Sequence, residues 1–210
     1  MSSNNEEASE ETDNGIKVIL VGEAGTGKTS LINSIQGKEF IEGEQMSSMT
    51  CSYIKLKFPI EGEVYKLRLW DTIGQEQYRS LTKMFLNCAK IVIFVFDITN
   101  KESFQALDFW YDTIESELGK GPIKGIAANK QDLYEEQIVE DDTIEEYANN
   151  KGLKFVYTTA TNPVGFKTLL EDLLKKYLKK IGKQNPEGKN KNGTKLKKIK
   201  GDKQKKKKCC

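Results

Sequence analysis

A glycine-rich segment follows the first apolar run of the chain and fits the pattern G-x-x-x-x-G-K-[ST]: Gly22, Glu23, Ala24, Gly25, Thr26, Gly27, Lys28 and Thr29. Its glycines allow a backbone path whose N–H groups point inward, and a helix beginning at Lys28 adds its positive end. Lys28 can then reach the β- and γ-phosphates of a nucleotide, while the Thr29 hydroxyl ligates Mg²⁺. The segment therefore predicts a phosphate-binding loop, with Ser30 as a further contact. The alternative, a glycine-rich turn that binds nothing, is weakened by the matching strand and helix on either side.

A second polar group, Asn129-Lys130-Gln131-Asp132, follows a later apolar run. It is similar to the N-K-x-D signature of guanine-nucleotide-binding proteins. A carboxylate at Asp132 accepts two parallel hydrogen bonds from the guanine N1–H and exocyclic amine, which adenine cannot present. Lys130 is expected to lay its stem along the base, and Asn129 to tie this loop to the phosphate loop. An Asn/Asp turn would explain such residues alone, but their position after a phosphate loop favours the nucleotide.

The elements that must position these residues alternate along the chain. Buried strands are predicted over 17–21, 65–70, 91–96, 123–127 and 155–158, with an alternating strand nearer an edge over 52–58. Helices are predicted over 29–36, 75–87, 102–118, 141–150 and 163–181. The pattern predicts an α/β fold with a mostly parallel, six-stranded sheet and helices on both faces. Ligands of such sheets bind at the carboxyl ends of the strands, where both polar groups lie.

Charge divides the chain into three parts. The chain of 210 residues has a net charge of +2, yet residues 1–13 hold five acids and no base. Residues 183–210 hold twelve lysines and two acids. We therefore expect an acidic, disordered stretch over 1–14, one domain over 15–181 and a polybasic, disordered tail over 182–210. No window reads as a membrane span or a secretory signal, and Cys51 and Cys88 are expected to be small buried residues in a reducing cytosol.

With the segment LWDTIGQE at 69–76, the two motifs make residues 15–181 resemble the small Ras-like GTPases, which are P-loop proteins, and more closely the Rab family. Rab-like segments are KLRLWDT at 66–72, YRSLTKMF at 78–85 and FVFDITNKESF at 94–104. Competing branches fit less well, because there is no Rho-like insertion and position 2 is serine rather than glycine. Two weaker elements also match: Phe40 is similar to the aromatic that packs on guanine, and Thr159-Ala160-Thr161 to the S-A-K loop.

The resemblance implies roles at the carboxyl end of the strand over 65–70. Asp71 is expected to hold Mg²⁺ through water, the Gly74 N–H to meet the γ-phosphate, and Gln75 to position the attacking water. Gln75 and Lys28 are therefore the expected catalytic residues of a slow GTPase that binds GTP and GDP.

Four residues depart from the Rab pattern, and one of them, Ala24 in the phosphate loop, is expected to be harmless. Ile73 stands where the family has alanine, which places ordinary hydrolysis in question. Ser48 takes the place of the threonine that ligates Mg²⁺ and contacts the γ-phosphate, with Ser47 or Thr50 as alternatives. Thr161 replaces a lysine. A nucleotide-dependent scaffold with little or no hydrolysis is therefore an alternative function.

The chain ends in KKKKCC, and Cys209 and Cys210 resemble the doubly geranylgeranylated ending of Rab proteins. Two lipids with polybasic charge give stable anchoring. A tail that binds nucleic acid is the rival interpretation, although no specific nucleic acid is expected. The resemblance implies a switch in vesicle trafficking on the cytoplasmic face of an internal membrane, with a cytosolic pool. Its implied partners are exchange factors, activating proteins, a dissociation inhibitor, an escort with prenyltransferase, and effectors.

Overall fold

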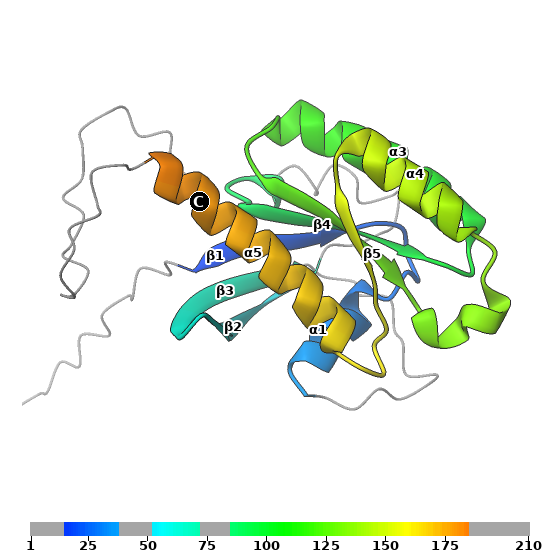
Figure 1. Cartoon of the computed structure of the whole chain (residues 1–210), viewed down its shortest axis with the longest axis horizontal. Helices are drawn as coiled ribbons and strands as arrows, with labels where there is room; N and C mark the ends of the chain where they lie inside the picture. The colour runs from blue at the N-terminus through cyan, green and yellow to red at the C-terminus, as the bar shows by residue number, and fades with distance from the viewer. Residues whose placement is uncertain (1–14, 38–51, 72–84, 185–210) are drawn as a thin grey trace, which may run out of the picture.

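The computed structural model describes residues 15–37, 52–71 and 85–184 (Figure 1). The strands are β1 (Ile16–Val21), β2 (Ser52–Ile60), β3 (Glu63–Asp71), β4 (Ile91–Asp97), β5 (Ile123–Asn129) and β6 (Lys154–Tyr157). The helices are α1 (Lys28–Ile35), α3 (Lys101–Leu118), α4 (Asp141–Lys151), α5 (Val164–Gln184) and the 3₁₀ helix η2 (Gln131–Glu136).

The strands form one six-stranded sheet in the order β2-β3-β1-β4-β5-β6. β2 and β3 are antiparallel, and every other neighbouring pair is parallel. The register pairs Leu20 with Asp71 and Asp97 with Asn129, so the strand ends meet at one edge of the sheet. The predicted α/β fold with a mostly parallel, six-stranded sheet is confirmed.

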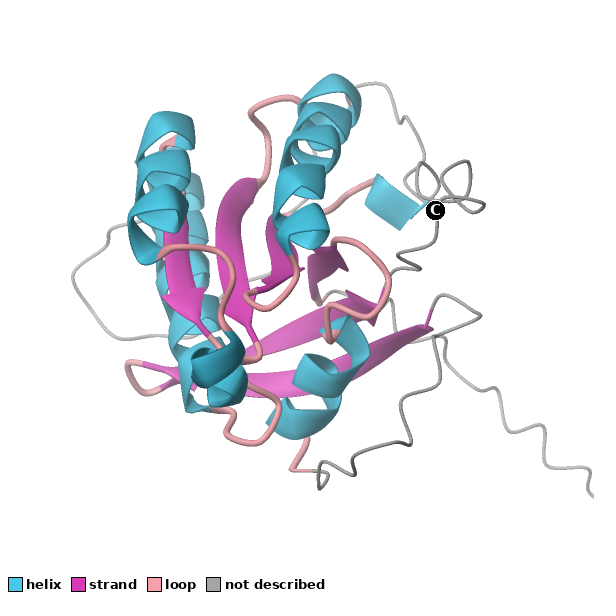
Figure 2. Cartoon of the chain, turned by 90° about the vertical axis from the view of Figure 1, so that its right-hand side faces the viewer, coloured by secondary structure: helices cyan, strands magenta, loops and turns pink. Residues whose placement is uncertain are grey.

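Helices cover both faces of this sheet (Figure 2). On one face, Val18 and Leu20 of β1 pack in a core with Leu31 of α1 and Leu170 of α5. On the other face, Ile19 packs in a second core with side chains of α3 and α4. β4 is buried along its whole length, as expected for a strand with helices on both sides. This packing holds the carboxyl ends of the central strands in fixed positions.

The edge hairpin is longer than predicted. Pairing between β2 and β3 continues from Ser52↔Asp71 to Ile60↔Glu63. Glu61 and Gly62 form the turn with φ of 51° and 84°, the left-handed conformation that a two-residue hairpin needs. α5 also continues to Gln184, beyond its predicted end at Ile181, and so includes a further lysine-rich turn. The helix predicted over 75–87 lies mostly outside the described residues, of which Phe85 and Leu86 are helical.

The expectation for Cys88 is wrong, because this half-buried cysteine is disulfide-bonded. No other cysteine belongs to the part of the chain that the structure describes. Spacing along a sequence does not report which cysteines the fold brings together. Among the helices of the described ranges, none combines the length and apolar character needed to cross a bilayer.

Candidate nucleotide-binding site

The glycine-rich loop connects β1 to α1 and takes a conformation that depends on glycine. A Cβ on Gly22 would lie 2.0 Å from the Val95 carbonyl oxygen of the neighbouring strand, and a Cβ on Gly27 would lie 2.3 Å from Asn129 Nδ2. Gly27 is also the residue before α1, and no side chain caps the helix there. The backbone N–H groups at the start of α1 are therefore available to an anion.

Lys28 is held inside this loop. It is buried, and its Nζ donates to the backbone oxygens of Gly22 at 2.9 Å and Glu23 at 2.7 Å. Burial lowers the pKa of the ammonium to about 8, against the opposing effects of the Asp71 and Glu23 carboxylates. A buried cation whose acceptors among the described residues are carbonyl oxygens gains strongly from a phosphate oxygen nearby.

Thr29 and Asp71 bring hard oxygen atoms together beside the loop. Thr29 Oγ1 donates to Asp71 Oδ2 at 2.6 Å, although the two residues come from α1 and the end of β3. A hydroxyl and a carboxylate are ligand types that Mg²⁺ prefers. The two residues therefore fit a magnesium ion at the position where phosphates bound by the loop would lie.

Asn129, at the end of β5, links the second polar group to the phosphate loop. Its buried Nδ2 donates to the Thr26 backbone oxygen at 2.7 Å, and its Oδ1 accepts from Thr158 Oγ1 at 3.0 Å. Three segments far apart in the sequence are thus joined through one amide. This places the predicted base-binding residues beside the phosphate loop.

The residues after Asn129 present a lysine and a carboxylate. Lys130 has φ of 66°, a left-handed conformation unusual for lysine, and its Nζ lies 2.6 Å from Asp97 Oδ2. Asp132 is exposed and accepts a short hydrogen bond from Thr159 Oγ1. Thr161 Oγ1 lies 2.8 Å from Thr159 Oγ1, so the threonine that departs from the family pattern extends this chain of hydroxyls. The geometry orients Asp132 without the usual lysine.

The structure brings together the predicted residues of the phosphate loop, Asp71 and the two base-binding loops. Ala24 and Gly25 are exposed at the tip of the phosphate loop. Ser30 and Ala160, which directly follow Thr29 and Thr159, are half-buried. The remaining predicted residues lie outside the described ranges: Phe40, Ser48, Ile73, Gly74, Gln75, Cys209 and Cys210.

Sequence reasoning missed three residues that support the site. Asp97 pairs with Lys130, Thr158 holds Asn129, and the buried Trp110 of α3 donates through Nε1 to Glu23 Oε1 at 3.1 Å. Asp97 could have been found, because it follows an apolar run just as Asp71 and Asn129 do. No sequence signal indicates the contact between Trp110 and Glu23, since 87 positions separate them.

Comparison with known proteins agrees with this geometry. The model of the Ras family matches residues 17–179. The chain is 31% identical over 162 residues to "Ras-related protein Rab5A" of Oryza sativa subsp. japonica, covering 77% of this chain and 79% of that protein. It is 30% identical over 172 residues to "Ras-related protein RABF2a" of Arabidopsis thaliana, covering 82% and 86%. Against "Ras-related protein Rab-26" of Rattus norvegicus it is 32% identical over 148 residues, covering 70% of this chain and 58% of that protein.

Proposed function

The chain belongs to the Ras family and is a Rab-family small GTPase, and from that premise we propose that it works as a slow, membrane-anchored switch in vesicle trafficking. It binds guanine nucleotide and hydrolyses GTP. The observation that carries the proposal is the bond from Asn129 to the Thr26 backbone oxygen at 2.7 Å, because it sets a base-binding loop against a phosphate-binding loop. Guanine selection by Asp132 follows from its carboxylate, which matches two donors that adenine lacks.

The proposed mechanism is positioning and electrostatics. Lys28 and the backbone of the phosphate loop bind the β- and γ-phosphates, while Gln75 orients the attacking water and the Gly74 N–H meets the γ-phosphate. Thr29 and Asp71, with Ser48, would hold a Mg²⁺, which neutralises charge on the phosphate oxygens when bound. Ser47 and Thr50 are the alternatives to Ser48. Without an activating protein, turnover is expected on the order of 10⁻⁴ s⁻¹, the intrinsic rate of Ras.

An aromatic surface next to residues 72–84 supports the proposal that effectors and regulators bind there. Tyr53, which is 41% exposed, stacks on Trp70 with ring centroids 4.7 Å apart. The ring centroid of Phe85, the residue directly after 72–84, lies 6.0 Å from that of Trp70. Exposed aromatic side chains are favoured anchors at protein interfaces.

Single-turnover hydrolysis by the purified chain with Mg²⁺ tests the switch. We expect slow hydrolysis of GTP, none of ATP, and a rate at least about tenfold lower in Gln75→Leu, which loses the group that orients water. The rival function, a scaffold with little hydrolysis, is supported if the wild-type chain binds GTP without hydrolysing it and Ile73→Ala restores turnover. If the wild-type chain and Ile73→Ala hydrolyse GTP at the same rate, on the order of 10⁻⁴ s⁻¹, then Ile73 does not impair hydrolysis.

The membrane anchor is tested by Cys209→Ser with Cys210→Ser. The lysine-rich tail and its terminal cysteines support attachment to the cytoplasmic face of an internal membrane, with a cytosolic pool. In cell fractionation the double variant is expected to move to the cytosol; its retention on membranes argues against lipid anchoring. If the tail instead binds nucleic acid, both proteins co-purify with nucleic acid at low salt and lose it in moderate salt.

A further inference from the structure

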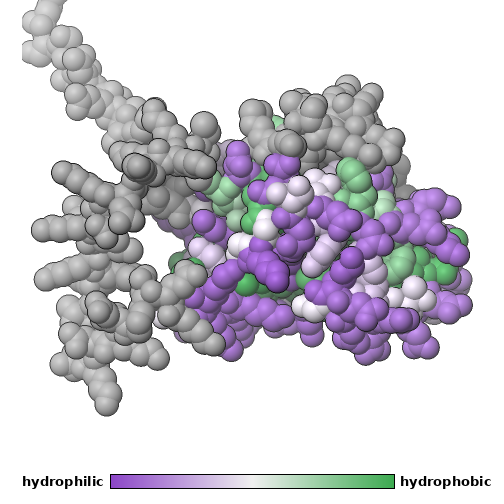
Figure 3. All heavy atoms as spheres, turned by 90° about the horizontal axis from the view of Figure 1, so that it is seen from above, coloured by the Kyte–Doolittle hydropathy of each residue, from purple (hydrophilic) through white to green (hydrophobic). Residues whose placement is uncertain are grey.

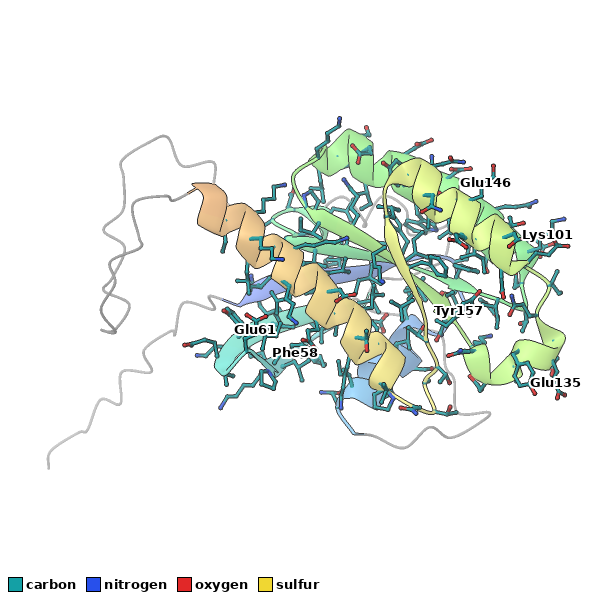
Figure 4. The ribbon with its side chains drawn as sticks, in the orientation of Figure 1. Phe58, Glu61, Lys101, Glu135, Glu146 and Tyr157 are labelled. Carbon is teal, nitrogen blue, oxygen red and sulfur yellow. The ribbon has the colours of Figure 1, made fainter. Side chains whose placement is uncertain are left out.

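The surface formed by η2, the loop after it and the first turns of α4, here called the η2–α4 surface, combines apolar and acidic side chains. Leu133, Tyr134 and Ile138 are 36%, 66% and 59% exposed. The chain carries no lysine or arginine from position 131 to 150. Lys101, at the start of α3, lies between Glu135 and Glu146 in the view of Figure 4. Six exposed carboxylates of η2, the loop and α4 belong to this surface: Glu135, Glu136, Glu140, Asp142, Glu145 and Glu146. Glu135 and Glu146 point away from the domain in Figure 4.

Neither the fold nor the nucleotide site accounts for this surface. Asp141 and Asp142 lie in the first turn of α4, where acids stabilise a helix start, but the acids of η2 and of the second turn of α4 have no such position. Within the described ranges, none of the six carboxylates forms an ion pair. The face seen in Figure 3 is mostly hydrophilic. Of the large hydrophobic side chains exposed in the described ranges, Leu133, Tyr134 and Ile138 all belong to the η2–α4 surface, whereas the others come from several different elements.

The C-terminal part of the chain contains a segment of matching chemistry. Residues 195–200 read KLKKIK, with four lysines around Leu196 and Ile199. Besides these two, no leucine, isoleucine or valine occurs between positions 185 and 208. A tail that acted through charge alone would need neither of them. The segment pairs two apolar side chains with four cations, as the η2–α4 surface pairs three apolar side chains with six anions.

The chain between α5 and this segment can extend past the full length of α5. α5 ends at Gln184, at the opposite end of the domain from η2 (Figure 1). α5 spans about 31 Å, and twelve extended residues from Gln184 to Leu196 span about 40 Å, so Leu196 can extend about 9 Å beyond the first turn of α5. Because the two partners belong to one chain, binding is intramolecular and proceeds at an effective concentration of about millimolar.

We propose that residues 195–200 of the same chain dock on the η2–α4 surface, with Leu196 and Ile199 against Tyr134 and Ile138 and the lysines beside the carboxylates. Docking competes with anionic lipid for the same lysines. This inference goes beyond the proposed function, and it does not depend on GTP hydrolysis.

Zero-length carbodiimide cross-linking of the full-length, unlipidated chain with bound GDP tests the docking, because it joins only amines and carboxylates in contact. Peptide mass spectrometry is expected to find lysines 195, 197, 198 and 200 joined to Glu135, Glu136, Glu140 or Asp142. These cross-links should occur in monomers, at all protein concentrations, and should weaken in high salt. Cross-links spread evenly over exposed carboxylates, including Glu61 at the far end of the domain in Figure 4, overturn the proposal. Cross-links confined to dimers also overturn it, because the occupant is then a second copy.

Apolar variants separate docking from attraction between charges. Tyr134→Ser with Ile138→Ser keeps every amine and carboxylate, and should lower the cross-links about tenfold, the effect of about 1.4 kcal/mol of lost apolar burial. Leu196→Ser with Ile199→Ser should do the same. The matched control is Val64→Ser with Val164→Ser, at positions that are 61% and 63% exposed elsewhere on the domain. Equal loss in the control, or no loss in the two test variants, refutes a specific site.

Discussion

Asp97 Oδ2 lies 2.6 Å from Lys130 Nζ, and this ion pair joins the end of β4 to the base-binding loop after β5. Asp97 is buried, and its Oδ1 also accepts from the backbone N–H of Thr99 at 2.9 Å and from the Thr99 hydroxyl at 2.7 Å. These two hydrogen bonds fix the orientation of the carboxylate that pairs with Lys130. Lys130 stands in a left-handed backbone conformation, and its ion pair with Asp97 holds the end of its side chain.

Asp97→Asn is expected to speed the release of GDP about tenfold, because the amide keeps the shape of the carboxylate but loses a charge-assisted hydrogen bond of about 1.5 kcal/mol. Release of a fluorescent GDP analogue measures the rate. Asp108→Asn is the control, since Asp108 also pairs with a lysine, Lys151 at 3.0 Å, on the surface of α3. The same acceleration in both variants contradicts a positioning role for Asp97.

Periodicity predicted those parts of the fold in which burial alone decides the structure. The continuous apolar run of β4, the alternation of β2 and the repeat of α5 each indicate which faces of the element are buried. The contacts of Asp97 and Trp110 were not predictable in this way, because they depend on which distant segments the sheet brings together. η2 was missed for a related reason: its six residues bury no side chain and leave no apolar period.

Gly27→Ala is expected to weaken GDP binding at least about tenfold more than Gly25→Ala. Both glycines have positive φ, at 88° and 77°, so both substitutions strain the backbone. Only the Cβ at Gly27 meets another atom, Asn129 Nδ2 at 2.3 Å, and it would displace the amide that joins the two loops. Calorimetric titration of the nucleotide-free proteins with GDP measures the difference. Equal affinities would show that the link through Asn129 does not contribute to binding.

Trp110→Phe should both destabilise the domain and loosen the phosphate loop. The indole N–H donates to Glu23 Oε1 at 3.1 Å, and a bond to a charged acceptor stabilises by about 1.5–3 kcal/mol. Urea unfolding measures the stability, and GDP release reports on the loop. Trp70→Phe is the matched control, because within the described residues the buried Trp70 Nε1 has no hydrogen-bond partner. Faster GDP release in Trp110→Phe alone supports coupling between α3 and the loop; loss of stability without faster release contradicts it.

Binding of GDP should take up protons at alkaline pH through Lys28. Burial lowers the pKa of this ammonium to about 8 in the nucleotide-free domain, so at pH 8 about half of the molecules hold a neutral amine. The phosphates favour the charged form and raise the pKa in the complex. The complex therefore binds more protons than the free protein, and affinity falls as the pH rises above 8. Calorimetry in two buffers of different ionisation enthalpy should find uptake of about half a proton at pH 8, where the terminal phosphate of GDP is already ionised. No uptake at pH 8 would mean that Lys28 is already fully charged before the nucleotide binds.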